Sequence, residues 1–229
     1  MTQITDHLAD ILKRVSRAAQ AAQRPDARVT VVAVSKQQPV AAIRQAFVAG
    51  QRDFGESYVQ EALPKMDALA DLGIIWHYVG RIQANKTRDI AARFQWVHTV
   101  DRAKIATRLN EHRPHHAPPL NVLIQVNPAG EASKGGVAPE HVAALARELA
   151  SLSRLKLRGL MTIPPAEGDP SPWFEQVADL HAQLVAAGLP LDTLSMGMSG
   201  DFEAAIGAGS TCVRIGAAIF GPRGLADRG

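Results

Sequence analysis

Strand-like and helix-like segments alternate along almost the whole chain, and this alternation constrains the fold more than any other feature of the sequence. The first strand-like segment, residues 29–35, is a valine-rich run typical of a parallel strand buried on both faces. Further short apolar segments follow at 53–55, 75–79, 96–100, 120–126, 156–160, 193–195 and 212–215. About eight strands alternating with helices favour a parallel sheet closed into a barrel, and an open doubly wound sheet is the alternative.

Helix-like segments lie between the predicted strands. The clearest are residues 39–49, 139–151 and 173–187. Gly50 and Gly188 follow the first and third of these, at the usual position of a helix stop. Ahead of the first strand, apolar residues recur at helical spacing from Ile4 to Val15, which predicts one more amphipathic helix. We therefore predict a single α/β domain over residues 1–229, a (β/α)8 TIM-type barrel with an extra N-terminal helix.

The composition of the chain argues against several classes of protein. No apolar run reaches 18 residues, and the N-terminal segment is amphipathic with acidic residues, so we expect neither a membrane span nor a signal peptide. Lysine and arginine number 25 against 22 aspartate and glutamate, so the net charge of +3 gives little support to a nucleic-acid partner. Cys212 is the single cysteine and cannot form an internal disulfide, which agrees with a cytoplasmic location.

Lys36 is the first candidate for chemistry. It closes the valine run, on the same strand face as Val32 and Val34, and functional residues of such barrels lie at the carboxyl ends of the strands. An amine at the end of an apolar column is partly desolvated, which favours its neutral form and lets it condense with an aldehyde. A lysine that only extends its charged end into solvent is the alternative.

The last two predicted strands are followed by residues suited to a phosphate group. Ser199 offers a hydroxyl, Arg214 lies in the final strand, and the small residues Gly216, Ala217 and Ala218 come next. Backbone amides exposed by small side chains at a helix start are the recurrent phosphate site of this fold. Close packing of the small residues is the alternative, and the glycines do not match a dinucleotide or P-loop spacing.

Two loops are dense in polar residues directly after predicted strands, at 54–62 and 76–88. We expect the second loop to border a charged ligand, and a solvated turn is the alternative. Its polar residues are His77, Arg81, Gln83, Asn85 and Lys86. The loop 127–137 is either a flap with Lys134 at its tip or a simple surface loop.

A histidine cluster interrupts the alternation after the fourth predicted strand. His112, His115 and His116 lie in a proline-broken segment and could be taken for metal ligands. Supporting cysteine or carboxylate residues at ligand spacing are missing from that segment, so we predict no metal site there.

Taken together, these segments resemble the pyridoxal phosphate homeostasis protein family, single-domain relatives of the N-terminal barrel of bacterial alanine racemases. The resemblance covers nearly the whole chain. Its motifs are VAVSK at 32–36, FGESYVQEA at 54–62, WHYVGRIQANKTR at 76–88, VLIQVN at 122–127, LRGLMTIPP at 157–165 and LSMGMSGDFEAAIGAGSTCVRIGAAIFGPR at 194–223. The resemblance implies a fold-type III pyridoxal 5'-phosphate protein.

The resemblance also implies roles for particular residues. Lys36 would hold pyridoxal 5'-phosphate through a Schiff base as the internal aldimine, and Arg214 would face the pyridine nitrogen. Because a guanidinium does not accept a proton, it would weaken the cofactor as an electron sink. The phosphate would be bound by Ser199 and the backbone of Gly216 and Ala217. The remaining predicted cofactor-binding residues are Met198, Ile215 and Ser57, and Ser57 stands where the family usually has asparagine.

For the activity, the resemblance implies a non-catalytic carrier in the homeostasis and delivery of pyridoxal phosphate. We expect a cytoplasmic monomer that passes the cofactor to apoenzymes. A pyridoxal phosphate-dependent amino-acid racemase is the alternative, but only fourteen residues follow Ile215, too few for a second domain with the opposing base. An aldolase that uses the lysine without the cofactor is a further alternative.

Overall fold

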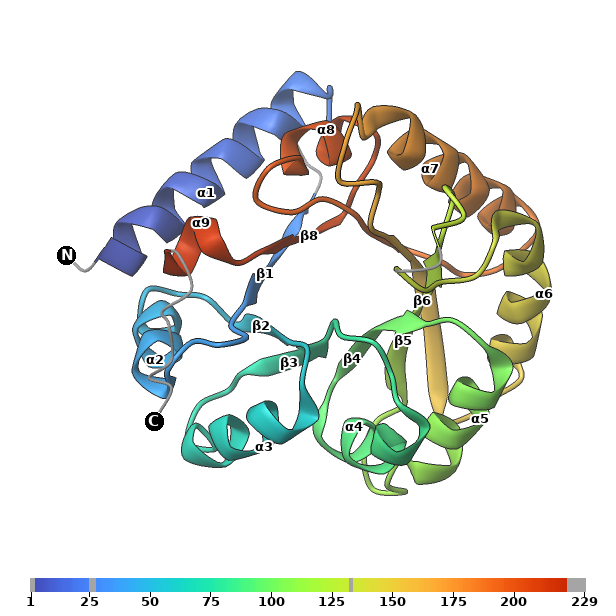
Figure 1. Ribbon diagram of the computed structural model, residues 1–229, viewed down its shortest axis with the longest axis horizontal. Helices are drawn as coiled ribbons and strands as arrows, with labels where there is room; N and C mark the ends of the chain where they lie inside the picture. The colour runs from blue at the N-terminus through green and yellow to red at the C-terminus, as the bar shows by residue number, and fades with distance from the viewer. Residues whose placement is uncertain (1–2, 25–27, 132–133, 222–229) are drawn as a thin grey trace.

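The computed structural model describes residues 3–24, 28–131 and 134–221. Within these residues, eight parallel strands pair in sequence order and β8 pairs with β1, which closes the barrel seen in Figure 1. The strands are β1 (Thr30–Val34), β2 (Asp53–Glu56), β3 (Ile75–Tyr78), β4 (Trp96–Val100), β5 (Leu120–Val126), β6 (Leu155–Thr162), β7 (Thr193–Ser195) and β8 (Cys212–Ile215). The predicted closed barrel is confirmed, and the open sheet is excluded.

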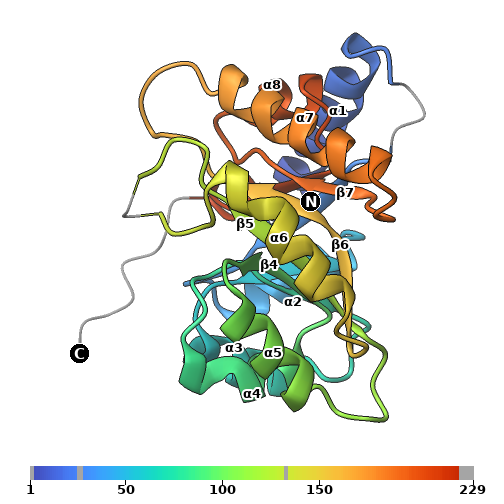
Figure 2. The ribbon, with the colours of Figure 1, turned by 90° about the vertical axis from the view of Figure 1, so that its right-hand side faces the viewer.

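Helices surround the barrel on its outer side (Figure 1). They are α1 (Gln3–Ala21), α2 (Val40–Val48), α3 (Val59–Ala68), the 3-10 helix η1 (Ala84–Lys86), α4 (Thr87–Arg93), α5 (Ala103–His112), α6 (Pro139–Ala150), α7 (Ser171–Ala186), α8 (Phe202–Gly207) and α9 (Ala217–Phe220). The side view shows α5, α6 and α7 stacked over the strands β5 and β6 (Figure 2). None of the described helices is both long and apolar enough to cross a membrane.

The extra N-terminal helix α1 is present as predicted and packs against α8 and α9. Its buried face consists of Leu8, Ile11, Val15 and Ala19, at helical spacing. Next to this apolar face, His7 Nδ1 lies 3.1 Å from the carbonyl oxygen of Ile219 in α9. Helix α1 therefore supports the short segment that follows β8, where the sequence predicts the phosphate site.

The barrel interior is more polar than the valine-rich strands suggest. Val31, Val32 and Ala33 of β1 are buried as expected for a strand covered on both faces. Polar side chains from other strands are buried with them, namely Glu56, His77, His98, Ser195 and Arg214. Buried polar groups are stable only when they are hydrogen-bonded, so each of these side chains needs a hydrogen-bond partner inside the barrel or on its wall.

Candidate functional site

A cavity of about 300 Å³ opens at the carboxyl ends of the strands, the end at which barrels of this type carry their sites. The described residues that line it are Val34, Lys36, Gln38, Ser57, Val79, Met161, Ile163, Met198, Ser199, Gly200, Arg214, Gly216, Ala217 and Gly221. All the predicted site residues except Ile215 are among them. The side chain of Ile215 is instead fully buried in the hydrophobic core.

The lining residues that the sequence analysis missed are mostly apolar. Val34, Val79, Met161 and Ile163 lie at or just beyond the ends of β1, β3 and β6. Their positions at the carboxyl ends of strands are the signal that could have found them, because functional residues of such barrels lie at those ends. Their side chains give the cavity apolar walls that can hold a flat ring.

The segment after β8 can bind an anion. Ser199 lines the cavity, and α9 begins at Ala217, so the first amides of this helix have no acceptor within it. The small residues Gly216 and Ala217 leave this backbone open to the cavity. The arrangement thus places anion-binding groups and the Lys36 amine in the same cavity.

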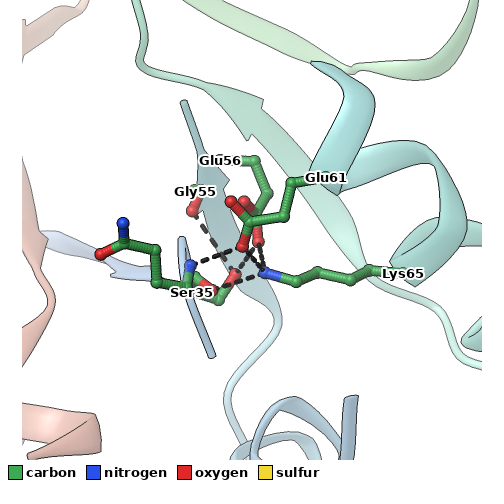
Figure 3. Close-up of polar contacts among 6 residues, drawn as sticks. Ser35, Gly55, Glu56, Glu61 and Lys65 are labelled. Carbon is green, nitrogen blue, oxygen red and sulfur yellow. Dashed lines mark hydrogen bonds and ion pairs between the residues drawn. The ribbon is translucent and has the colours of Figure 1, made fainter. Parts of the chain in front are cut away.

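Hydrogen bonds fix the backbone on both sides of Lys36, and Figure 3 shows the one between Ser35 and Lys65. The carbonyl oxygen of Ser35 accepts a hydrogen bond from Lys65 Nζ at 2.8 Å. The amide of Gln37 donates to Glu61 Oε1 at 2.5 Å, and Gln37 has a φ of 62°, in the left-handed region that is costly for a side-chain-bearing residue. The anchored neighbours therefore set the direction in which Lys36 leaves the strand.

A buried ion pair lies behind this anchor (Figure 3). Lys65 Nζ is 2.9 Å from Glu56 Oε1, which also accepts a hydrogen bond from Ser35 Oγ at 2.7 Å. Burial raises the pKa of Glu56, and Lys65 and Ser35 oppose that rise. Glu56 Oε2 is buried without a hydrogen-bond partner among the described residues, which makes Lys65 the main compensation for its charge.

This cluster was not predicted, although the sequence contains a signal for part of it. Glu61 and Lys65 are four residues apart in a helix-forming segment, the spacing of a stabilising pair on a helix face. Glu56 could not be assigned as their partner, since only the pairing of β1 with β2 brings it to Ser35.

Arg214 is buried and held by three hydrogen bonds. Its Nη1 donates to the carbonyl oxygen and to the hydroxyl of Ser195, both at 2.7 Å, and its Nη2 donates to the carbonyl oxygen of Thr162 at 2.9 Å. Burial lowers the pKa of the guanidinium, but arginine remains a cation that only donates hydrogen bonds. Strands β6 and β7 thus set the orientation of Arg214 at the cavity.

Only some residues of the two polar loops, 54–62 and 76–88, lie at the edge of the cavity. A Cβ on Gly80 would lie 2.1 Å from the carbonyl oxygen of Ser57, so only glycine allows the two loops to approach this closely. Arg81 and Lys86 line a separate small pocket with Ser57 and Tyr58. The interpretation of this loop as one ligand border was wrong for His77, which points into the barrel and contacts Asp53 and His98.

Neither the histidine-rich segment nor the loop with Lys134 contributes a described residue to the lining of the cavity. His112 Nδ1 is 3.1 Å from Thr87 Oγ1, and no group of three or more possible metal ligands occurs in the described part of the chain. Lys134 Nζ donates to the carbonyl oxygen of Pro164 at 2.5 Å and pairs with Glu131 at 2.7 Å. Residues 132–133 of this loop lie outside the described residues.

Comparison with known proteins identifies the family of the chain. The family described as "Alanine racemase, N-terminal domain" matches residues 7–224. The chain is 55% identical to the pyridoxal phosphate homeostasis protein of Pseudomonas aeruginosa, over 97% of both chains. It is 48% identical to the protein of the same name from Escherichia coli, over 97% of this chain and 98% of that one.

Solved structures show the same relationship. PipY of Synechococcus elongatus, solved without PLP, has a TM-score of 0.86 and 35% identity over 95% of this chain and 100% of its own. The same protein with PLP bound has a TM-score of 0.84 and 34% identity, with the same coverage. Alanine racemase of Clostridium difficile shares the fold alone, with a TM-score of 0.74 and 15% identity over 97% of this chain and 58% of the racemase. The chain therefore belongs to the alanine racemase N-terminal domain family and, within it, to the pyridoxal phosphate homeostasis proteins.

Proposed function

We propose that this chain binds pyridoxal 5'-phosphate at Lys36 and serves in the cytoplasmic homeostasis and delivery of the cofactor. The observation that carries the proposal is the single cavity that joins Lys36, Arg214 and the backbone after β8. Membership of the family supports it, since the relatives bear that name and PipY was solved with PLP bound.

The residues present fit this cofactor. Bound pyridoxal phosphate supplies an aldehyde that an amine can attack. In this chain the amine is that of Lys36, while Val34, Val79 and Met161 offer apolar walls for the ring. Ser199 and the amides at Gly216 and Ala217 would bind the phosphate, next to Met198.

The ionisable groups of the cavity favour a carrier over a racemase. Lys36 and Arg214 are the ionisable side chains among the described residues that line it. Racemisation needs a base on each face of the substrate carbon, and an arginine that keeps its proton at neutral pH does not act as one. Lys36, already engaged with the cofactor, is the remaining base. We infer that the protein does not turn over amino acids at ordinary enzymatic rates.

Covalent labelling tests the binding site. Purified protein is incubated with pyridoxal phosphate, its visible absorbance is recorded, and borohydride reduction is followed by peptide mass mapping. We expect an absorbance band that Lys36→Ala lacks and a reduced adduct on Lys36, while Lys104→Ala, at an exposed lysine on α5, keeps both. Absence of both signals from the unaltered protein would refute the proposal and favour an aldolase-like use of Lys36.

Delivery and turnover are measured separately. The loaded protein is expected to restore activity to an aminotransferase stripped of its cofactor. Single-enantiomer alanine or serine is expected to stay unracemised when incubated with the loaded protein. Sustained racemisation at enzymatic rates would replace the carrier proposal with the racemase alternative.

A further inference from the structure

Five side chains form a continuous line of hydrogen bonds across the inside of the barrel. Asp53 Oδ1 lies 2.9 Å from His77 Nε2, and His77 Nδ1 lies 2.9 Å from His98 Nε2. His98 Nδ1 lies 2.9 Å from Ser195 Oγ, which accepts a hydrogen bond from Arg214 Nη1 at 2.7 Å. We call these residues the barrel network: Asp53, His77, His98, Ser195 and Arg214.

The barrel network joins the two mouths of the barrel. Its members come from β2, β3, β4, β7 and β8, and all except Asp53 are buried. Asp53 has a side-chain exposure of 24% and lines a hollow of about 370 Å³ at the amino ends of the strands, beside Arg158 and Asp192. Arg214, at the other end, lines the proposed cofactor cavity.

The two ends fix the direction of every hydrogen bond between them. Arginine only donates, so the Ser195 hydroxyl oxygen must accept from Arg214, and its proton is then free for His98 Nδ1. An ionised aspartate only accepts, so His77 must present a protonated Nε2 to Asp53. A neutral His77 then accepts at Nδ1 from His98 Nε2. Both histidines therefore carry their proton on Nε2.

The reverse direction fails at Asp53. If His98 donated from Nδ1 to Ser195, a neutral His77 would turn an unprotonated Nε2 toward the carboxylate, and two acceptors would face each other. A doubly protonated His77 would avoid this conflict, but burial lowers the pKa of His77 despite the nearby Asp53. Cys212, which also interacts with the Ser195 hydroxyl, has a thiol and is only a weak competitor for its proton.

We propose that the barrel network positions Arg214, and that Asp53 at the opposite mouth sets the network's direction. Asp53, His77, His98 and Ser195 are then positioning residues for the proposed cofactor site. Since Arg214 keeps its proton, the network does not conduct protons into the cavity. The inference rests on the proposed function only where it concerns the bound cofactor, so its first two tests use protein without cofactor.

The first test reads the tautomers of His77 and His98 by nitrogen-15 NMR of the imidazole rings. We expect a protonated Nε2 and an unprotonated Nδ1 on both rings at neutral pH. Asp53→Asn, whose amide both donates and accepts, should add the second tautomer at His98, two hydrogen bonds away. Asp192→Asn removes a carboxylate from the same mouth and should leave both rings unchanged. A protonated Nδ1 on His98 of the unaltered protein, or a His98 that ignores Asp53→Asn, overturns the proposal.

The second test reads Arg214 directly. In the unaltered protein, the guanidinium N–H signals of Arg214 should be resolved and slow to exchange with water. Ser195→Ala should broaden them or speed their exchange, and Ser195→Thr should restore them. Ser210→Ala is the matched control, because Ser210 is equally buried but bonds only to backbone carbonyls in its described contacts. Arg214 signals that do not respond to Ser195→Ala contradict positioning by the network.

The third test uses the cofactor-loaded protein. Asp53→Asn should change the rate of cofactor release by roughly threefold or more, the scale expected for groups in one hydrogen-bonded network. Asp192→Asn should not. An unchanged release rate in Asp53→Asn, despite altered tautomers, means that the network does not act on the site. Failure of the unaltered protein to bind the cofactor refutes the proposed function and leaves the first two tests standing.

Discussion

Two residues that do not line the cavity, Lys65 and Glu61, determine the orientation of Lys36 toward it. Lys65 bonds to the backbone just before Lys36, and Glu61 bonds to the backbone just after it. The buried Glu56 carries the charge that keeps Lys65 in place. At the scale of single residues, the site therefore depends on an ion pair that does not line the cavity.

Removing one partner of this ion pair should lower the free energy of unfolding by more than an ordinary surface substitution does. Lys65→Met leaves Glu56 buried without its cation, and we expect the free energy of unfolding to fall by about 3–5 kcal/mol. Denaturation with urea measures the loss. Lys104→Met on the exposed side of α5 should change stability by less than about 0.5 kcal/mol. The double variant Glu56→Gln and Lys65→Met should recover part of the loss, and a Lys65→Met protein as stable as the control would contradict the argument.

The buried histidines predict a dependence of stability on pH. Burial lowers the pKa of both His77 and His98 from the ordinary value of 6.5, so each stays neutral when its unfolded counterpart takes up a proton. The contribution of each neutral histidine to stability is therefore complete above about pH 6.5 and decreases below it, with a slope of at most about 1.4 kcal/mol per pH unit for each histidine.

Unfolding of the protein and of His98→Asn, measured from about pH 7 to about pH 5.5, tests this dependence. In the variant, the free energy of unfolding should change less steeply with pH. The difference in slope should be about 1.4 kcal/mol per pH unit, which corresponds to one proton. His181, whose pKa is also lowered by burial, is present in both proteins and cancels in the comparison. Equal slopes would show that His98 does not stay neutral in the folded state.

At the scale of elements, the sequence predicts the order of strands and helices well because both faces of each strand are covered. The bounds expected for β4, β5, β7 and β8 agree with the structure. The bounds expected for β6, 156–160, are shorter than the observed strand, Leu155–Thr162. The interior Gly159 weakens the strand signal, and only the neighbouring strands β5 and β7 show that pairing continues past it.

Gly159 itself should resist substitution. Its φ is 152°, and a Cβ there would lie 1.8 Å from the carbonyl oxygen of Thr193 on β7, so the two strands would have to separate. We expect Gly159→Ala to lower the free energy of unfolding by about 4 kcal/mol or more, or to prevent folding. Gly73→Ala, with no atom within 4 Å of the added Cβ, should be close to neutral. Similar circular dichroism melting curves for the two variants would contradict the expected loss of stability in Gly159→Ala.

Whole-molecule closure explains what the sequence did and did not reveal about the site. Lys36 and Arg214 could be placed near one another in advance, because the first and last strands of a closed barrel are neighbours. Lys36 follows the first strand, and Arg214 lies in the last. The barrel network could not be predicted from the sequence, since Asp53, His77 and His98 each look like isolated polar residues in a strand. Only closure brings His98 within 2.9 Å of Ser195, 97 residues away.

Cofactor binding should stabilise the whole barrel. A ligand that binds only the folded state at 100 times its Kd adds about 2.7 kcal/mol to the free energy of unfolding. We expect an increase of this size with pyridoxal phosphate, measured by urea denaturation, and a much smaller one in Lys36→Ala. Lys104→Ala should respond like the unaltered protein. Equal stabilisation of Lys36→Ala would mean that the aldehyde is not bound at Lys36.

The barrel network also restricts the paths by which this sequence can evolve. Its members come from five strands, and replacing one of them by an apolar residue leaves a buried partner unsatisfied, at about 1–3 kcal/mol. An all-apolar interior lies several substitutions away, and each intermediate along that route is less stable than its starting point. We therefore expect related sequences either to keep the whole barrel network or to replace several of its residues together.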